Sequence, residues 1–285
     1  MSAAAGGGID APGFAGKRVV FKVGSSSVSG ENASQIPSLV ESLARVRRAG
    51  GEAILVSSGA IATGVPFLRL DARPDDLATQ QAAAAVGQNI LVNRYQRALS
   101  MHDIVAGQVL LTASDIENPT HRGNAKRAIE RLLQLGILPI INENDTVATH
   151  EIRFGDNDRL AALVARLVGA DRLVLLSDVD ALYTAPPTTA GATRIARVPY
   201  GDELAGVEIG ATQSGWGTGG AATKVQAARL AADAGTEVLL TETRLLGAVL
   251  DGGDHGTVFA AAPRTGAAGR SGGDAASYAD ARDKV

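Results

Sequence analysis

The stretch RVVFKVGSSS, residues 18–27, joins a run of strand-forming residues to a glycine and three serines. Similar runs recur along the chain, at 52–57, 104–111, 137–142, 172–177 and 236–240. They are apolar continuously rather than at every second position, which is typical of strands covered by helices on both faces. Most are separated by stretches of helical length, so the sequence predicts a layered α/β fold around a parallel sheet.

Two of the intervening stretches are predicted to be long helices. Residues 75–100 open with Asp75 and Asp76, whose carboxylates favour the positive end of a helix, and 119–135 open with Pro119, which fits a first turn. Both are interpreted as structural elements and are given no chemical role.

Length and composition exclude several classes of protein. A chain of 285 residues can form one large domain. Its 27 lysines and arginines nearly balance 30 aspartates and glutamates, and the net charge of −3 argues against nucleic acid as a partner. No cysteine is present, which excludes disulfides and thiolate chemistry and suits a reducing cytoplasm.

The two ends of the chain differ in composition from its middle. Residues 1–16 lack the features of a signal peptide, and no run approaches the ~20 apolar residues of a membrane span, so a cytoplasmic protein without a membrane partner is expected. Residues 264–285 are rich in Gly, Ala, Ser and Asp. We therefore expect one domain over 17–263 between flexible tails at 1–16 and 264–285.

Candidate binding residues follow the apolar runs, because ligands of open α/β sheets bind beyond the carboxyl ends of the strands. Lys22 precedes Gly24 and the serines, whose backbone N–H groups would suit phosphate. A lysine at the edge of the sheet above an ordinary turn is an equally good interpretation. In VSSGAIATG, 56–64, Gly59 would let a ligand approach the backbone and Ser58 offers a hydroxyl. Ser57 or Ser58 could instead cap a helix.

The densest polar cluster is NENDTVATHEIRFGDND, 142–158, between a strand and a helix. Its polar members are Asn142, Glu143, Asn144, Asp145, Glu151, Asp156, Asn157 and Asp158. A solvated loop in which Asp156 caps the helix is the plainer interpretation. The position at a strand end favours a set of acceptors and amides for an amino acid, with one carboxylate orienting lysines from elsewhere.

A glycine-rich segment, SGWGTGGAATK at 214–224, is predicted to cover ATP phosphates, with Thr223 and Lys224 entering a helix. It is not a Walker A motif. GWGTGG satisfies G-x-G-x-x-G and Glu242 follows about 20 residues later, as a dinucleotide site requires, but no apolar strand precedes it. A nicotinamide-dependent dehydrogenase therefore stays as an alternative.

Eight motifs follow one another in a familiar order: KVGSSS, VSSGAIATG, QQAAAAVGQ, GQVLLT, NENDTVAT, EIRFGDND, LLSDVDALYT and GTGGAATK. Between about residues 18 and 263 the chain resembles the glutamate 5-kinases of the amino acid kinase family. The resemblance implies the amino acid kinase fold, a three-layer αβα sandwich whose central sheet has about eight, mainly parallel, strands. Ala221 stands where that family commonly has methionine, and the C-terminal PUA domain of many bacterial members has no counterpart here.

The resemblance also implies roles for individual residues. Lys22 and Lys224 would contact the transferred phosphate and Asp158 would orient them, as the catalytic residues. Glutamate would be held by Ser58, Asp145 and Asn157. The nucleotide would be bound by Lys22, Ser177, Asp178, Thr218, Gly219, Gly220, Ala221, Ala222, Thr223 and Lys224. No residue is predicted to be a metal ligand.

The activity that the resemblance implies is phosphorylation of the glutamate side-chain carboxylate by ATP with Mg²⁺, giving glutamyl 5-phosphate in the first step of proline synthesis. Proline is then expected as feedback inhibitor, glutamyl phosphate reductase as downstream partner, and a homo-oligomer as the assembly. A glutamate side chain is already ionised at pH 7, so no general base is required, and the scattered histidines are given no role.

Other functions remain open at this point. A kinase of the same fold could act on aspartate, N-acetylglutamate or carbamate, and a non-catalytic amino acid sensor could keep the fold. Intact Lys22, Lys224 and Asp158 argue against the sensor, because a protein without catalysis would be free to lose them.

Overall fold

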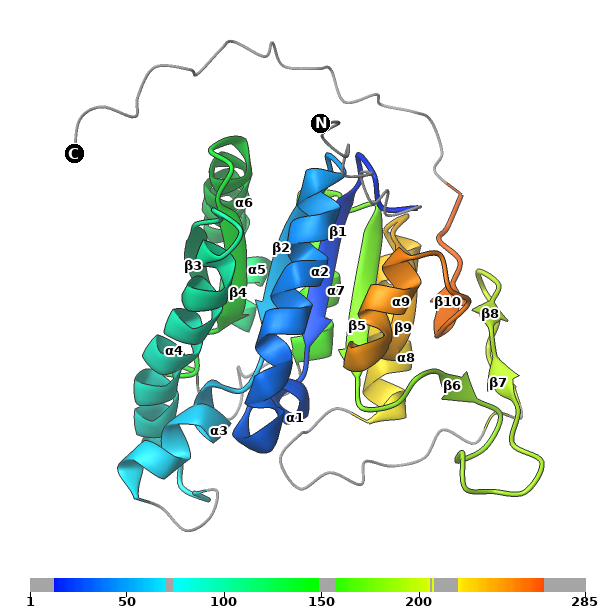
Figure 1. Ribbon diagram of the computed structural model, residues 1–285, viewed down its shortest axis with the longest axis horizontal. Helices are drawn as coiled ribbons and strands as arrows, with labels where there is room; N and C mark the ends of the chain where they lie inside the picture. The colour runs from blue at the N-terminus through cyan, green and yellow to red at the C-terminus, as the bar shows by residue number, and fades with distance from the viewer. Residues whose placement is uncertain (1–12, 70–73, 149–156, 206, 208–219, 264–285) are drawn as a thin grey trace, which may run out of the picture.

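The computed structural model describes residues 13–69, 74–148, 157–205, 207 and 220–263 (Figure 1). Its centre is an eight-stranded sheet with the order β3-β4-β2-β1-β5-β9-β10-β8. These strands are β1 Arg18–Val23, β2 Glu52–Ser57, β3 Ala106–Leu111, β4 Leu138–Glu143, β5 Arg172–Ser177, β8 Arg197–Val198, β9 Glu237–Glu242 and β10 Thr257–Phe259. A separate antiparallel pair is formed by β6 Leu182–Tyr183 and β7 Arg194–Ile195.

The sheet is mainly parallel, as predicted. Every neighbouring pair from β3 to β9 is parallel, β10 is antiparallel to β9, and β8 is parallel to β10. The six predicted strands are confirmed, with bounds shifted by one or two residues in β3, β4 and β9. Only β3 among them is largely half-buried, because it pairs on one side alone and forms the edge of the sheet.

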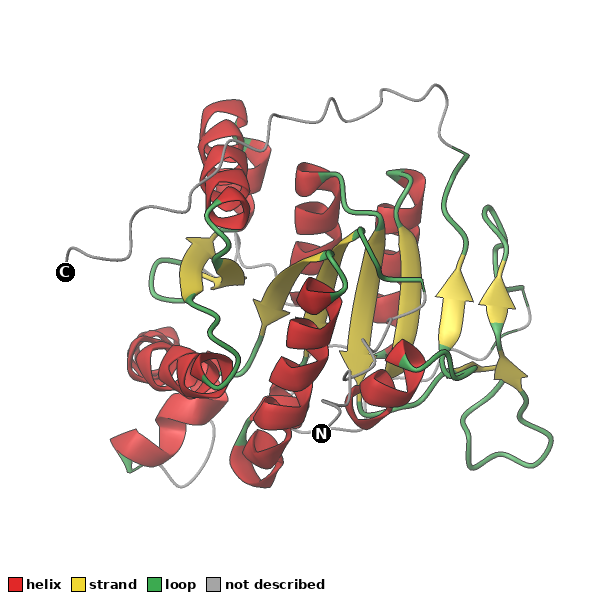
Figure 2. Cartoon of the chain, turned by 45° about the horizontal axis from the view of Figure 1, so that its top comes forward, coloured by secondary structure: helices red, strands yellow, loops and turns green. Residues whose placement is uncertain are grey.

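Helices cover both faces of the sheet, so the predicted three-layer αβα sandwich is confirmed (Figure 2). The α-helices are α1 Ser25–Val28, α2 Ile36–Arg48, α3 Ala60–Gly64, α4 Leu77–Ser100, α5 Ala113–Glu117, α6 Pro119–Gln134, α7 Asn157–Val168, α8 Ala221–Asp233 and α9 Leu246–Leu250. Short 3-10 helices are η1 Gly30–Gln35, η2 Val65–Leu68 and η3 Thr243–Leu245. No helix in these described parts of the chain is long and apolar enough to cross a bilayer.

The core has two halves, one on each face. Helices α6, α7 and α8 bury their apolar stripes on one face, and α2, α4 and α9 cover the other. Successive residues of a strand point to opposite faces, so Val19 and Phe21 of β1 pack toward α2 while Val20 packs toward α7. The same alternation directs Lys22 toward the face that carries α7 and α8.

Helices α3 and α4 cross in backbone contact. A Cβ atom on Gly64 would lie 1.9 Å from the carbonyl oxygen of Ala83, and one on Gly87 would lie 1.8 Å from that of Ala60. Only glycine allows this distance, which fixes α4 against the turn that follows β2.

Candidate active site

The site lies where the parallel strands end, along the lower edge of the sheet in Figure 1. Lys22 is the last residue but one of β1, in the middle of the sheet between β2 and β5. Lys22 therefore lies on a central strand, at its carboxyl end. Helices α7 and α8 begin at this edge and direct their positive N-terminal ends toward it.

Three charged side chains from three elements meet there. The Nζ atom of Lys22 lies 2.5 Å from Oδ1 of Asp158, and Nζ of Lys224 lies 3.1 Å from its Oδ2. Asp158 stands in the first turn of α7 and Lys224 in the first turn of α8. One carboxylate thus holds two ammonium groups side by side, which suits them to contact the oxygens of one anion.

All three side chains are buried: Asp158 is 0%, Lys22 4% and Lys224 7% exposed. Burial raises the pKa of the Asp158 carboxyl, but the charges and hydrogen bonds of Lys22 and Lys224 outweigh it and hold that pKa below its ordinary value. Asp158 is therefore ionised at neutral pH, and with little water to screen the charges the cluster interacts strongly with a ligand.

Next to this cluster, the amide of Asn157 lies against the turn after β2. Its Nδ2 lies 2.9 Å from the Ser58 hydroxyl oxygen and 3.1 Å from the Ser57 carbonyl oxygen. Ser58 and Asn157, two of the three predicted glutamate-binding residues, are thus in direct contact. The Oδ1 atom of Asn157 is buried without a hydrogen-bond partner among the described residues.

Neither Ser57 nor Ser58 caps helix α3, so that interpretation is wrong. Gly59 occupies the cap position with φ of 98°, a left-handed conformation that glycine adopts without strain, and no side chain caps the helix. The Ser57 hydroxyl instead lies 2.9 Å from the hydroxyl of Tyr95 on α4, a fully buried side chain.

Predicted nucleotide-binding residues lie at the end of β5. Ser177 is buried and its hydroxyl donates to Asp178, 3.0 Å away, which is exposed. The Thr243 hydroxyl, after β9, donates to the Ser27 hydroxyl at 3.0 Å and approaches the Ser177 carbonyl oxygen at 3.4 Å. Thr243 was not predicted, because its segment carries no phosphate-binding pattern, and Ser27 was not singled out among the serines that follow Gly24.

The remaining predicted residues are placed only in part. Gly220 and the start of α8, including Ala221, Ala222 and Thr223, are described, and the Thr223 hydroxyl donates to the Gly220 carbonyl at 2.9 Å. Thr218 and Gly219 lie outside the described residues, as do Glu151, Asp156 and the rest of the glycine-rich segment. Asp145 lies in the turn after β4 and is half-buried.

The sequence interpretation missed the contribution of α4, which it treated as purely structural. Gln88 of this helix lies with its Oε1 2.7 Å from Nδ2 of Asn142 at the end of β4, and Asn142 Oδ1 lies 2.9 Å from Asn157 Nδ2. The available signal was Gln88 itself, a polar residue that follows the alanine-rich run 82–86 after one glycine.

Comparison with known proteins places this geometry in a family. The model of the amino acid kinase family matches residues 17–242. The chain belongs to that family. Within it, the chain is 69% identical over 244 residues to the glutamate 5-kinase of Clavibacter michiganensis subsp. michiganensis, covering 86% of this chain and 94% of that protein. The resemblance found in the motifs is thereby confirmed.

Other amino acid kinases extend the comparison. The glutamate 5-kinase of Leifsonia xyli subsp. xyli is 68% identical over 250 residues, which cover 87% of this chain and 93% of that protein. That of Streptomyces coelicolor is 54% identical over 256 residues, which cover 88% of this chain and 68% of that longer protein. A solved structure, carbamate kinase from Giardia lamblia bound to AMP-PNP, aligns with a TM-score of 0.64 at 14% identity, over 87% of this chain and all of that one, and shows the shared fold.

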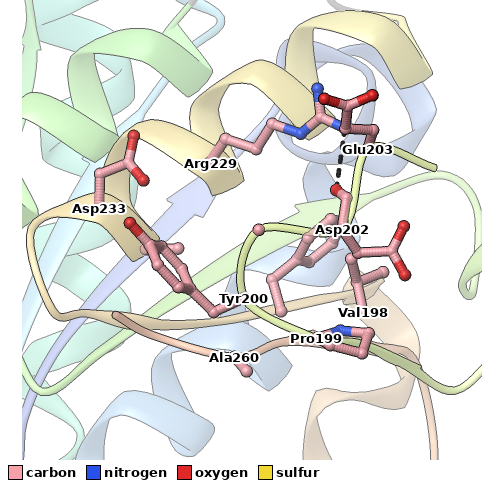
Figure 3. A pocket seen from close by; sticks show the side chains of 11 residues that line it. Val198, Pro199, Tyr200, Asp202, Glu203, Arg229, Asp233 and Ala260 are labelled. Carbon is pink, nitrogen blue, oxygen red and sulfur yellow. Dashed lines mark hydrogen bonds between the residues drawn. The ribbon is translucent and has the colours of Figure 1, made fainter. Parts of the chain in front are cut away.

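A separate hollow of about 260 Å³ lies at the opposite end of α8 (Figure 3). Arg229 donates to the Asp202 carbonyl oxygen, and a hydrogen bond to Asp233 raises the pKa of the Tyr200 hydroxyl. Among the described residues, none of those predicted for the site lines this hollow. Arg229 and Tyr200 each bond within its lining, and we assign the hollow no role in the chemistry.

Proposed function

We propose that this chain transfers the γ-phosphoryl group of ATP to the side-chain carboxylate of L-glutamate, giving L-glutamyl 5-phosphate, the first step of proline biosynthesis. The observation that carries the proposal is the buried cluster in which Asp158 holds Lys22 and Lys224 together. The glutamate 5-kinases that match this chain over most of its length support glutamate as the acceptor.

The chemistry requires no proton transfer. An oxygen of the ionised side-chain carboxylate attacks the γ-phosphorus in line, the bond to the bridging oxygen breaks, and ADP leaves with that electron pair. Catalysis then consists of bringing two anions together and stabilising charge on the transferred group. Lys22 and Lys224 supply two positive charges for this, and Asp158 keeps them at a fixed separation.

Glutamate is proposed to lie beside the turn after β2, where Ser58 and Asn157 meet, with Asp145 as a third contact. The Asn157 oxygen, which has no partner among the described residues, supports this position, because a buried acceptor without a donor costs free energy unless a ligand supplies one. The α-ammonium group of glutamate is such a donor. ATP would then approach from the side of Ser177, Asp178 and residues 218–224.

Magnesium is proposed to enter with the ATP phosphates. In the parts of the chain that the structure describes, no group of three acidic or histidine side chains could hold a metal ion. This fits Mg²⁺, which retains several waters and binds substrate phosphates with few protein ligands. The ion would neutralise charge on the β- and γ-phosphates.

Three further expectations are proposals. Proline inhibits the enzyme, a glutamyl phosphate reductase takes up its product, and the chain assembles as a homo-oligomer. The outer face of α4 supports the last. Between Ala78 and Asn93 its exposed residues carry no charge, the next exposed residue is Arg97, and nearby Phe67 is 58% exposed. The exposed residues of this uncharged stretch are Ala78, Ala82, Ala85, Val86, Asn89 and Asn93. A sedimentation coefficient of a single chain would count against assembly.

The test of the proposed function is a panel of acids. With ATP, Mg²⁺ and hydroxylamine, which traps acyl phosphates, the chain should give hydroxamate from glutamate and much less trapped product from aspartate, N-acetylglutamate or carbamate. Greater activity on one of the other acids would assign the chain to another branch of the family. Nicotinamide binding is no longer expected, because the family assignment replaces the dehydrogenase alternative.

A further inference from the structure

The side-chain amides of Asn142 and Asn157 lie beside the proposed glutamate position and are hydrogen-bonded to each other. A backbone group at each end of this pair fixes which way its amide points. The backbone N–H of Glu143 donates to Oδ1 of Asn142 at 2.9 Å. At the other end, the Ser57 carbonyl oxygen accepts from Nδ2 of Asn157 at 3.1 Å. A backbone N–H can only donate and a carbonyl oxygen can only accept, so neither amide can be reversed without placing like groups against each other.

The same reasoning fixes the Asn157 oxygen that lies at the proposed glutamate position. Since Asn142 Oδ1 must accept, its neighbour Asn157 presents Nδ2 to it at 2.9 Å. The other end of the Asn157 amide, Oδ1, is then left as a buried acceptor that no described residue meets. Since Asn142 Nδ2 must donate, the group opposite it has to be an acceptor, and Gln88 Oε1 meets it at 2.7 Å.

We propose that Gln88 is a positioning residue that lets the enzyme select substrates with an α-ammonium group. It holds Asn142, which holds the Asn157 amide with its oxygen toward that ammonium. The inference rests on the proposed function, because it assumes that glutamate is the acceptor at this site. Gln88 itself does not touch the substrate.

The position of Gln88 is well determined for this task. It follows Gly87, whose close contact with Ala60 fixes α4 against α3, and α3 follows directly from the turn that carries Ser58. Helix and turn are thus held at one distance, and the glutamine bridges from the helix to the strand end at Asn142.

The test compares glutamate with glutarate, which keeps both carboxylates and lacks only the ammonium. Gln88→Met removes the acceptor at nearly constant shape. We expect it to raise the KM for glutamate about threefold to tenfold, the value of one neutral hydrogen bond, with little change in kcat. Glutarate, measured as alternative substrate or competitive inhibitor, should be affected much less, so the preference for glutamate falls. Gln88→Glu retains an acceptor and should restore the preference.

Gln96 gives a matched control on the same helix. Its Oε1 accepts from the Ala106 backbone N–H at 2.8 Å and its Nε2 donates to the Ile104 carbonyl, so it makes comparable bonds far from the site. Gln96→Met should lower the Tm and leave the preference for glutamate unchanged.

The proposal is overturned if Gln88→Met leaves the preference intact, if it weakens both acids equally, or if Gln96→Met changes the preference as much. Gln88→Leu is the second variant without an acceptor. If both apolar variants fail to fold while Gln88→Glu folds, Gln88 serves the stability of the fold and the proposal is wrong. A wild-type chain that phosphorylates no glutamate would defeat the proposed function instead, which separates the two failures.

Discussion

Asp158 determines the balance of charge in the site. Two ammonium groups with little water around them would repel each other. A single carboxylate between them attracts both and offsets that repulsion. The arrangement gives the site two cations that are held ready for an anion. In-line phosphoryl transfer uses such fixed charges, because they need no rearrangement as the reaction proceeds.

Removing this carboxylate should therefore cost stability in a pH-dependent way. The pKa of Asp158 is held below its ordinary value by Lys22 and Lys224, so its contribution is complete above the unfolded carboxyl pKa of about 4 and is lost as the pH falls through the lower folded pKa. At neutral pH we expect Asp158→Asn to lower the free energy of unfolding by about 3–5 kcal/mol. Urea titrations should show this gap narrowing below about pH 4; a gap that stays constant down to strongly acidic pH would contradict the assignment.

Lys224 should act on the transition state more than on bound ATP. If its ammonium stabilises charge that develops during transfer, Lys224→Ala should lower kcat by about 10²–10³ and change the Kd for ATP little. Lys224→Arg should rescue poorly, since a planar fork replaces a compact charge. Steady-state kinetics and calorimetric ATP titration measure the two effects. Near-normal kcat with a proportionate loss of ATP affinity would make Lys224 an anchor for the ground state.

At the scale of elements, the crossing of α3 and α4 positions the substrate side of the site. Its contact depends on Gly64 and Gly87, where an added Cβ would overlap backbone atoms of the facing helix. Because backbone cannot move aside as a flexible side chain can, the helices themselves would have to separate.

Gly87→Ala tests the importance of this contact. We expect a loss of about 1–3 kcal/mol from overpacking, together with a raised KM for glutamate, because Gln88 moves with the helix. Gly247→Ala is the control, since a Cβ there meets nothing within 4 Å; alanine should leave α9 unchanged or slightly stabilised. Chemical denaturation and kinetics of both variants give the answer, and equal behaviour of the two would show that the crossing is not tightly packed.

These elements also show how far the sequence predicts the structure. The six long strands are predictable because each contains a mainly apolar run, and all but the edge strand β3 are covered on both faces. Strands β6, β7, β8 and β10 have two or three residues each, too few for any periodicity to appear. The contact of Lys22 with Asp158 follows from the family motifs, whereas Gln88 was missed because its partner Asn142 lies 54 residues away and only the fold brings them together.

For the whole molecule, the end of the domain can be located by truncation. The backbone N–H groups of Ala260 and Ala262 donate to Val198 and Ala232, so the chain is still tied to β8 and α8 there. Deletion of 264–285, a segment with few large apolar side chains, should leave Tm and kinase activity unchanged. Deletion after Phe259 removes both bonds and should lower Tm. A large loss of Tm or activity on deletion of 264–285 alone would show that these residues stabilise the domain.

The central claim is that the substrate's own carboxylate attacks the γ-phosphorus of ATP, and transfer of an oxygen label tests it most directly. Glutamate carrying ¹⁸O in its side-chain carboxylate is phosphorylated in unlabelled water, and hydroxylamine then releases phosphate by attack at the acyl carbon. The bridging oxygen leaves with phosphorus, so each phosphate should carry one ¹⁸O atom from the label, visible as an isotope shift in the ³¹P spectrum. Phosphate without label would mean that water is the nucleophile, and the account of the site as a carboxylate kinase would be wrong.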